Sequence, residues 1–261
     1  MRLEGLRIVL TGASGGIGSR LSGLLAAHDA DLTIIGRSRG VSGAARFVEA
    51  DLSCAKGIVA ASDAMTRLSP DVLVHLAGAQ RFGAFETQGA VQMLRDYHVN
   101  LLAPALLTRA ALPGMKERGF GHVLFAGSVF GSIPFAHFAS YSSAKAGLAA
   151  LATALRRECA RDNVTFTLAT PRAVDTAMAT PAIRQFATMA GFSFDNADVV
   201  AQRLFRAIAG RRASVSPGFP ESVFMRLNAL APSLVGRALA RTDRKARSLL
   251  DSYPETEGPR S

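Results

Sequence analysis

Short apolar runs alternate with longer helical stretches through the first two-thirds of the chain. Most of the runs are continuously hydrophobic, a pattern typical of strands covered on both faces of a sheet. The predicted strands are Ile8–Leu10, Leu32–Ile35, Arg46–Val48, Val72–Leu76, Val123–Ala126, Thr165–Leu168 and Ala213–Ser216. The predicted helices are Ile17–Ala27, Val91–Arg118, Tyr141–Arg161 and Asp198–Ala209. This alternation predicts an α/β fold: one doubly wound domain with a mostly seven-stranded parallel sheet and helices on both faces.

Prolines divide two of the helical stretches. Val91–Arg118 contains Pro104 early in its course and Pro113 near its end, followed by Gly114. Proline removes an amide donor and clashes with the carbonyl one turn earlier, so we expect this helix to break at Pro113–Gly114. Pro220 and Pro232 likewise divide the segment after Pro217 into at least two helices.

The segment after Pro217 exceeds what the α/β domain needs. Its helically spaced apolar residues are Val223, Phe224, Leu227, Leu230, Leu234, Val235, Ala238 and Leu239, beside Arg237, Arg241, Arg244 and Arg247. Packing on its own domain or on a neighbouring subunit is the first interpretation, and peripheral contact with a membrane is the second. Nucleic acid is not expected, since base-stacking aromatics are not interleaved with the basic residues. We predict three parts. These are the α/β domain over residues 1–218, a helical C-terminal extension over 219–254 that packs on this domain, and a frayed tail over 255–261.

Composition narrows the class of protein. Hydrophobic residues make up 49% of the 261 residues, enough for a large core and against general disorder. The formal net charge is +10, and ten Lys or Arg with two acids lie between Arg203 and Arg247. Cys54 and Cys159 show no metal-ligand spacing, so no metal is predicted and a reducing compartment is favoured. With no secretory leader or membrane-spanning run recognised, we expect a cytoplasmic protein.

A glycine-rich octet, TGASGGIG at residues 11–18, follows the first predicted strand and opens the first helix. Glycines at such a junction let the backbone approach a pyrophosphate, and the helix N-terminus favours the anion. This placement is more specific than the glycine pattern alone. The octet therefore predicts a dinucleotide site.

The turn after the second strand, Gly36–Arg39, bears on the choice of dinucleotide. An acid at this place binds the adenosine ribose hydroxyl, whereas an arginine accommodates a 2′-phosphate. The turn contains Arg37 and Ser38 and has no acid. We therefore expect NADP(H) to be preferred, with NAD(H) as the alternative and with Arg37 covering the adenine face as the other interpretation.

Ser128, Tyr141 and Lys145 form the candidate chemical centre. Ser128 ends the fifth apolar run, and Tyr141 and Lys145 lie four residues apart at the start of a helix, so they project from one helix face. A nearby ammonium favours the phenolate and lowers the pKa of a tyrosine, as a general acid–base requires. Each feature alone has an ordinary explanation. A tyrosine and a lysine four residues apart are often a surface pair, and a serine after a strand often caps a helix or turn. Their combination is more specific.

The chain resembles the short-chain dehydrogenase/reductase family in its shorter form, over about residues 5–218. The resemblance rests on TGASGGIG at 11–18, Asp51-Leu52, HLAG at 75–78, Asn100 in YHVNLLAP, Ser128, the YSSAK motif at 141–145, and TPRAVDT at 170–176. It implies a Rossmann-type fold and a homodimer or homotetramer. The implied catalytic residues are Asn100, Ser128, Tyr141 and Lys145. The implied cofactor-binding residues, Arg37 and Ser38 included, are Gly12, Ser14, Gly16, Ile17, Gly18, Arg37, Ser38, Asp51, Leu52, Ala77, Gly78, Tyr141, Lys145, Pro171, Val174 and Thr176.

The resemblance also implies a role for each catalytic residue. Tyr141 would exchange a proton with the substrate oxygen, and Ser128 would position that oxygen. Lys145 would lower the pKa of Tyr141 and bind the nicotinamide ribose, and Asn100 would hold a water that links Lys145 to solvent. Val174 and Thr176 would hold the carboxamide of the cofactor.

Two departures from the family pattern bear on these expectations. His75 and Leu76 replace the two asparagines of the family's N-N-A-G, which puts the bracing of the central strands in doubt more than the chemistry. Arg172 replaces the glycine after Pro171, and it either points outward or narrows the site and attracts an anionic group. The outward orientation is the favoured interpretation.

A lipophilic carbonyl or alcohol is the expected substrate. The predicted walls of its pocket, to which the C-terminus should add, carry Phe130, Ile133, Phe135, Phe138, Met178, Phe186, Met189, Phe192 and Phe194. His137 lies in the same stretch, where a structural role is favoured over orienting a substrate group. The leading hypothesis is an NADP(H)-dependent ketone reductase or alcohol dehydrogenase. A catalytically silent cofactor sensor and an isomerase or dehydratase on the same fold are the alternatives.

Overall fold

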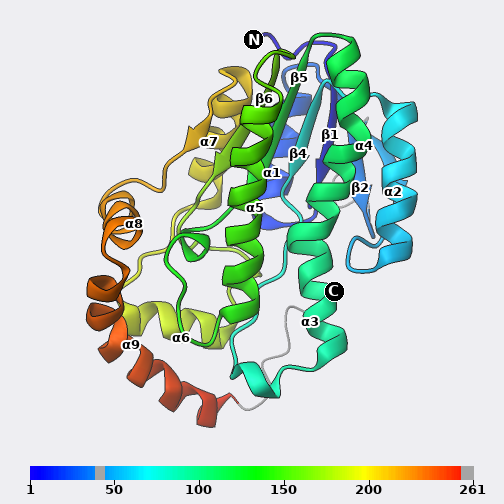
Figure 1. Ribbon diagram of the computed structural model, residues 1–261. Helices are drawn as coiled ribbons and strands as arrows, with labels where there is room; N and C mark the ends of the chain where they lie inside the picture. Colours follow the sequence, from blue (N-terminus) through cyan, green and yellow to red (C-terminus); the bar gives the residue numbers. More distant parts are fainter. Residues whose placement is uncertain (39–44, 254–261) are drawn as a thin grey trace.

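The computed structural model describes residues 1–38 and 45–253 (Figure 1). Arg39 of the Gly36–Arg39 turn and the predicted frayed tail therefore lie outside the described residues. The strands are β1 Arg7–Thr11, β2 Asp31–Gly36, β3 Arg46–Glu49, β4 Val72–His75, β5 Gly121–Ala126, β6 Val164–Ala169 and β7 Ser214–Val215. They form one sheet in the order β3-β2-β1-β4-β5-β6-β7, with every neighbouring pair parallel. The predicted doubly wound α/β fold is confirmed.

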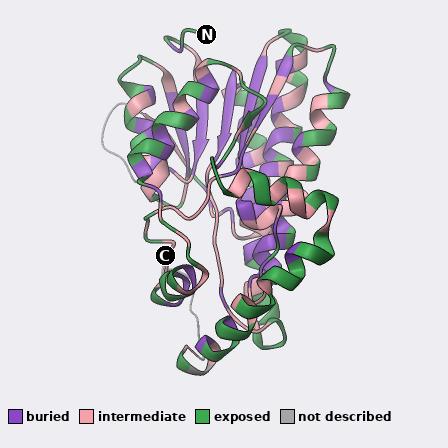
Figure 2. Cartoon of the chain, turned by 90° about the vertical axis from the view of Figure 1, so that its left-hand side faces the viewer, coloured by how far each residue is buried: buried purple, intermediate pink, exposed green. Residues whose placement is uncertain are grey.

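Helices cover both faces of the sheet, which is why its strands are continuously apolar (Figure 2). Helices α1 Gly16–Ala26 and α7 Ala197–Ala209 pack together on one face. Helices α2 Ala55–Leu68, α4 Ala103–Glu117 and α5 Ala139–Glu158 cover the other. The buried core runs on both sides of β1, β4 and β5, where residues such as Ile8, Val74 and Phe125 are fully enclosed.

The helix predicted over Val91–Arg118 differs from expectation in two places. It is α3 Ala90–Tyr97, a π-helical turn at His98–Leu102 and then α4, which continues through Pro113 to Glu117. The expected break at Pro113–Gly114 is wrong. A proline this late removes one hydrogen bond, and the burial of Ala111 and Met115 against the sheet keeps the last turn in place.

Two helices were not predicted, namely α2 and α6 Pro181–Ala190. Short side chains dilute the apolar pattern of α2, whose buried face is Gly57, Ile58, Ala61, Ala64 and Met65. The N-terminus of α6 is capped by the Thr180 hydroxyl, which accepts from the Ile183 amide at 3.4 Å, and Pro181 occupies its first turn.

The C-terminal extension forms two helices, α8 Glu221–Leu230 and α9 Pro232–Ser252. Figure 1 places them with α6 beyond the carboxyl ends of the strands. One stripe of α9, including Val235, Ala246 and Leu249, is buried in an aromatic cluster with residues of α6. This stripe of α9 faces its own domain, and the extension encloses the end of the molecule at which the strands terminate. Most of the predicted apolar stripe is exposed instead, namely Val223, Phe224, Leu230, Leu234 and Ala238.

Candidate active site

Two adjacent cavities that share lining residues lie at the point where the sheet reverses its winding direction, between β1 and β4. One has a volume of about 570 Å³ and the other of about 230 Å³, and both are lined by Gly12, Ser14, Gly78 and Met178. Ligands of doubly wound folds bind in the crevice at this switch point. Each of the predicted catalytic and cofactor-binding residues lines one of these two cavities.

The glycine-rich turn is shaped by close backbone approaches. Gly12 has φ +76°, and a Cβ there would collide with the Ala77 amide at the end of β4. A Cβ at Gly18 would collide with the Gly12 carbonyl, and one at Gly16 with the Thr176 side chain. The N-cap of α1 is Gly15, with no capping side chain, so the first turn of α1 has amides available for an anion. This glycine-lined turn fits the pyrophosphate of a dinucleotide.

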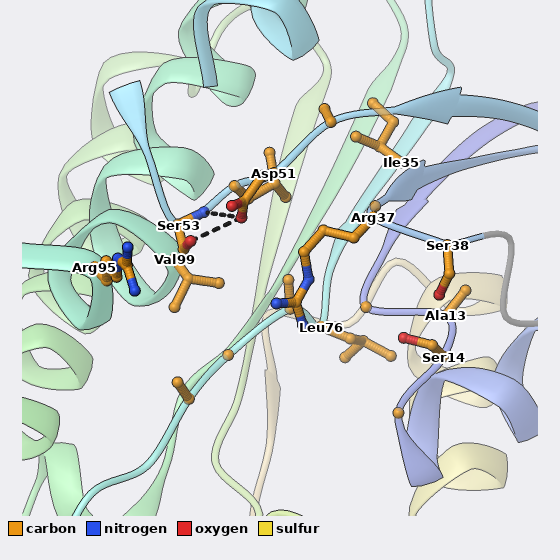
Figure 3. A pocket seen from close by; sticks show the side chains of 18 of the residues that line it. Ala13, Ser14, Ile35, Arg37, Ser38, Asp51, Ser53, Leu76, Arg95 and Val99 are labelled. Atoms are coloured by element: carbon orange, nitrogen blue, oxygen red, sulfur yellow. Dashed lines mark hydrogen bonds between the residues drawn. The ribbon is translucent and has the colours of Figure 1, made fainter. Parts of the chain in front are cut away.

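The larger cavity carries the adenosine-side candidates. Figure 3 shows Arg37 reaching between Asp51 and Leu76, with Ser38 on one side and Arg95 on the opposite wall. Asp51 Oδ1 accepts from the Ser53 amide at 2.9 Å and the Ser53 hydroxyl at 2.7 Å. Burial acts to raise the pKa of Asp51, but these hydrogen bonds and the charges of Arg37 and Arg95 hold it below its usual range. The carboxylate is thus turned toward Ser53, while the guanidinium groups of Arg37 and Arg95 border the cavity, which Arg81 also lines.

The segment after β4 is braced without the two asparagines of the family motif. His75 is buried, its Nε2 lies 3.0 Å from Thr108 Oγ1 of α4, and its ring stacks on Phe125. Burial, with the Lys145 charge, lowers the pKa of His75 to about 3, so it is neutral. The Ala77 amide donates to Thr11 Oγ1 at 3.2 Å. In this way β4 is tied to both α4 and β1.

Asn100 sits in the π-helical turn and is fully buried. Its Nδ2 donates to the carbonyls of Ala79 at 2.8 Å and Asp96 at 2.9 Å, and its Oδ1 accepts from the Ala79 amide at 3.3 Å. A Cβ at Gly78 would lie 3.0 Å from Asn100 Oδ1 and 3.6 Å from Lys145 Nζ. Asn100 therefore fixes the chain beside Gly78, next to the ammonium of Lys145.

Tyr141 lies in the first turn of α5 with its phenol buried at the smaller cavity, which Ser128 also lines. Burial raises the pKa of Tyr141, and a hydrogen bond with Ser128 partly offsets the increase. The lowering of this pKa expected from Lys145 is not seen, because desolvation disfavours the phenolate and Lys145 Nζ lies 5.7 Å from the ring centroid. The phenol is therefore protonated near neutral pH.

Lys145 projects one helical turn further along α5 and is buried. Its Nζ donates to the Ala126 carbonyl at the end of β5 at 2.8 Å. Burial lowers its pKa to about 8. A cation at this place, with a pKa close to neutral pH, is typical of a functional site.

The loop after β6 forms the floor of the smaller cavity through Pro171, Val174 and Thr176. Arg172 turns its guanidinium to two carboxylates, Asp195 at 2.6 Å and Glu221 at 3.4 Å. Arg172 lines the smaller cavity, so the expected outward orientation is wrong, but its charge is matched by these two acids and is not left for an anionic substrate group. The pair with Glu221 also ties the start of α8 to this loop.

Aromatic residues form the rest of the smaller cavity. Of the predicted wall residues, Phe130, Met178, Phe186, Phe192 and Phe194 line it. Ile133, Phe135 and Phe138 are instead buried behind them, where Met189 also packs. The expected lining from the C-terminus is not found among the described residues, because α8 and α9 pack behind the aromatic layer. Ile183, on the same helix α6 as Phe186, also lines the cavity but was not predicted.

Comparison with known proteins identifies the family of the chain. A family model described as short chain dehydrogenase matches residues 7–186. The chain therefore belongs to the short-chain dehydrogenase/reductase family of oxidoreductases. The match spans β1 to α6 and includes the glycine-rich turn, Ser128, Tyr141 and Lys145.

Relatives and solved structures agree with this assignment. The chain is 28% identical to a dehydrogenase/reductase SDR family member 7B from Mus musculus, over 92% of this chain and 82% of that protein. It is 30% identical to a ketoacyl reductase from Nostoc sp., over 71% of this chain and 72% of that protein. It is also 30% identical to a 3-dehydrosphinganine reductase from Danio rerio, over 67% of this chain and 58% of that protein. A short chain dehydrogenase from Burkholderia cenocepacia, solved in complex with NADP, shares the fold with TM-score 0.77 and 21% identity over 92% of this chain and 99% of that one.

Proposed function

We propose that this chain is an NADP(H)-dependent oxidoreductase that interconverts a carbonyl and an alcohol on a lipophilic substrate, with Tyr141 as the acid–base. The observation that carries the proposal is the meeting of Tyr141, Ser128 and buried Lys145 at one small aromatic cavity. This cavity opens beside a glycine-lined turn that fits a pyrophosphate. A bound nicotinamide would supply the hydride.

The protein's own part in the chemistry is proton transfer and positioning. Tyr141 donates its phenolic proton to the carbonyl oxygen during reduction, and Ser128 holds that oxygen beside the phenol. The Lys145 ammonium stabilises the phenolate left behind. Burial raises the pKa of Tyr141, so the phenol carries the proton that reduction of a carbonyl requires.

Two arginines support NADP(H) over NAD(H). Arg37 and Arg95 line the adenosine-side cavity from opposite walls, and both lie close enough to Asp51 to lower its pKa (Figure 3). A phosphate monoester carries charge that suits guanidinium groups, whereas an unsubstituted ribose does not need them. The structurally similar dehydrogenases from Burkholderia cenocepacia and Sphingobium yanoikuyae were solved with NADP and NADPH respectively.

The substrate is proposed to be a lipophilic ketone. Aromatic and aliphatic side chains dominate the walls of the smaller cavity, including Phe130, Phe192 and Ile183. The relatives named as a ketoacyl reductase and a 3-dehydrosphinganine reductase support a long-chain 3-oxo compound within this class.

Self-association is proposed through α3 and α4. Val91 and Leu94 of α3, Leu102 of the intervening π-helical turn and Leu106 of α4 are 67%, 60%, 41% and 39% exposed. An exposed apolar surface of this kind is typical of a subunit interface. Sedimentation of the purified chain is expected to give a dimer or tetramer.

Titration with NADPH and NADH, followed by an absorbance assay at the nicotinamide band, tests the proposed function. Medium-chain 3-oxo thioesters and cyclic ketones serve as substrates. The expected result is tighter binding of NADPH with turnover of the more apolar ketones. Tight binding with no turnover of any ketone would instead favour a cofactor sensor, and equal binding of both cofactors would contradict the phosphate-binding role of the arginines.

A further inference from the structure

The outer surface of the C-terminal extension combines exposed apolar side chains with basic ones. The most exposed large apolar residues of the described chain, Leu230 at 86% and Phe219 at 81%, lie at the two ends of α8. Val223, Phe224 and Leu234, between and beyond them, are 51%, 48% and 48% exposed. Figure 2 turns this side of the molecule toward the viewer. We call these five residues the apolar patch.

Helix α9 continues this surface with positive charge. Arg237, Arg241, Arg244 and Lys245 are exposed and recur at the spacing of one helix face, opposite the buried stripe that contains Val235 and Ala246. Arg226 adds a further exposed cation on α8. Between residues 219 and 250, all of which the structure describes, the two acids are both partly buried. Glu221 pairs with Arg172, and one carboxylate oxygen of Asp243 is buried.

We propose that the apolar patch and the basic face of α9 dock on the surface of an anionic lipid bilayer. Apolar side chains enter the boundary between headgroups and acyl chains, and arginines beside them contact lipid phosphates and carboxylates. No helix in the described part of the chain is long and apolar enough to cross a membrane, so the contact is peripheral.

A second copy of the chain fits this surface less well than lipid does. Most oligomers associate through the same patch on both subunits, which would bring the arginine face of α9 against its own copy. Like charges placed together across an interface are costly. The exposed surface on α3 and α4 carries Val91, Leu94, Leu102 and Leu106 instead and is better suited to subunit contact.

The docked surface would stand next to the substrate pocket. Asn228 of α8 donates to the Ser132 carbonyl at 2.8 Å, and Met225 and Leu227 pack on the aromatic layer that lines the smaller cavity. Glu221 contacts Arg172 of the cavity floor. An orientation with α8 on the membrane therefore brings the cavity close to the source of a lipophilic substrate, although docking itself does not depend on the proposed reaction.

Vesicle co-sedimentation of the full chain tests the proposal. We expect binding to vesicles of phosphatidylcholine mixed with phosphatidylserine, weaker binding to phosphatidylcholine alone, and loss of binding at high salt. The variant Phe219→Ser/Leu230→Ser removes the tips of the apolar patch, and Arg237→Glu/Arg241→Glu reverses the charge of the basic face. Each pair is expected to weaken binding at least tenfold. Each basic residue near an anionic surface contributes about fivefold, and burial of a large apolar side chain contributes at least as much.

Matched substitutions elsewhere control for general effects. Val59→Ser/Val199→Ser changes two exposed apolar residues on α2 and α7, and Arg67→Glu/Arg161→Glu changes two exposed cations. Both control variants should bind vesicles like the parent chain, and circular dichroism checks that every variant is folded. The proposal is overturned if the parent chain does not bind the anionic vesicles or if either test pair leaves binding unchanged. It is also overturned if Phe219→Ser/Leu230→Ser dissociates an oligomer without reducing vesicle binding.

Discussion

The cofactor and catalytic region differs from the substrate wall in how its residues are held. Around Gly12, Asn100 and Lys145, backbone approaches and directional hydrogen bonds fix each atom. The wall is a layer of rings instead, in which Phe130, Phe135, Phe138, Phe186 and Phe192 pack with centroids 4.7–6.4 Å apart. Directional contacts suit chemistry that tolerates little displacement, whereas apolar packing tolerates changes of shape.

This difference separates two kinds of side-chain change. A single substitution in the cofactor and catalytic region is expected to change turnover or cofactor preference by a large factor. Substitutions in the wall are expected to alter substrate affinity in proportion to the apolar surface removed. Four predictions, from the largest expected effect to the smallest, examine this division.

Tyr141→Phe is expected to lower kcat for ketone reduction by about 10²–10⁴-fold, because it removes the proton donor and little else. The dissociation constant for NADPH should change little. Tyr97→Phe is the matched control, since the Tyr97 hydroxyl contacts Ser143 Oγ at 2.6 Å outside both cavities. Residual turnover in Tyr141→Phe equal to that of Tyr97→Phe would remove Tyr141 from the mechanism.

Arg37→Asp is expected to weaken NADPH binding about 10- to 100-fold, because a charged hydrogen bond is lost and a like charge faces the phosphate. NADH binding should change far less. Fluorescence titration with both cofactors measures the ratio, and Arg67→Asp serves as a control for the change in net charge. An equal loss for both cofactors would contradict a phosphate-specific role.

The pH profile of reduction should fall above pH about 8, where buried Lys145 loses its proton. The sign follows from burial, which lowers this pKa from its usual value, so the ammonium is present below about 8 and is lost as pH rises through it. The decline of kcat/KM should approach tenfold per pH unit. A profile that is flat to about pH 9.5 would mean that the charge of Lys145 is not required.

Phe192→Ala is expected to raise KM for a large apolar ketone about three- to tenfold with kcat nearly unchanged, because it removes binding shared by ground and transition states. Steady-state kinetics on ketones of increasing chain length provide the measurement, and Phe120→Ala, remote from both cavities, is the control. A fall in kcat as large as that of Tyr141→Phe would show that the wall also positions the reacting atoms.

Short motifs predicted which residues line the candidate active site, because each motif consists of a few neighbouring residues. The octet at 11–18 follows β1 and leads into α1, and Tyr141 and Lys145 share one face of α5. Parallel pairing then brings the ends of β1, β4 and β5 to one edge. Every predicted catalytic and cofactor-binding residue consequently lines one of two neighbouring cavities. Their catalytic and cofactor-binding roles, and the cytoplasmic location, stay predictions.

Other features depended on contacts between distant segments. The continuation of α4 through Pro113 required the packing of Ala111 and Met115, which a rule about proline does not include. The raised pKa of Tyr141 reflects burial, which sequence spacing does not report. Arg172 bonds to Asp195 and Glu221, which lie 23 and 49 residues away in the sequence.

The sequence by itself determined the α/β class, the succession of strands and helices along the chain, and the family. Apolar periodicity and short motifs are local properties, so they can be recognised without the fold. Tertiary structure decided which aromatic residues line the cavity and which support them, since that depends on how α6, α8 and α9 pack on one another. It also decided that Val235, Ala246 and Leu249 of α9 are buried while Leu234 and the arginines of this helix are exposed. Burial belongs to the folded chain as a whole, and it sets both the protonation of Tyr141 and the surface that the extension presents.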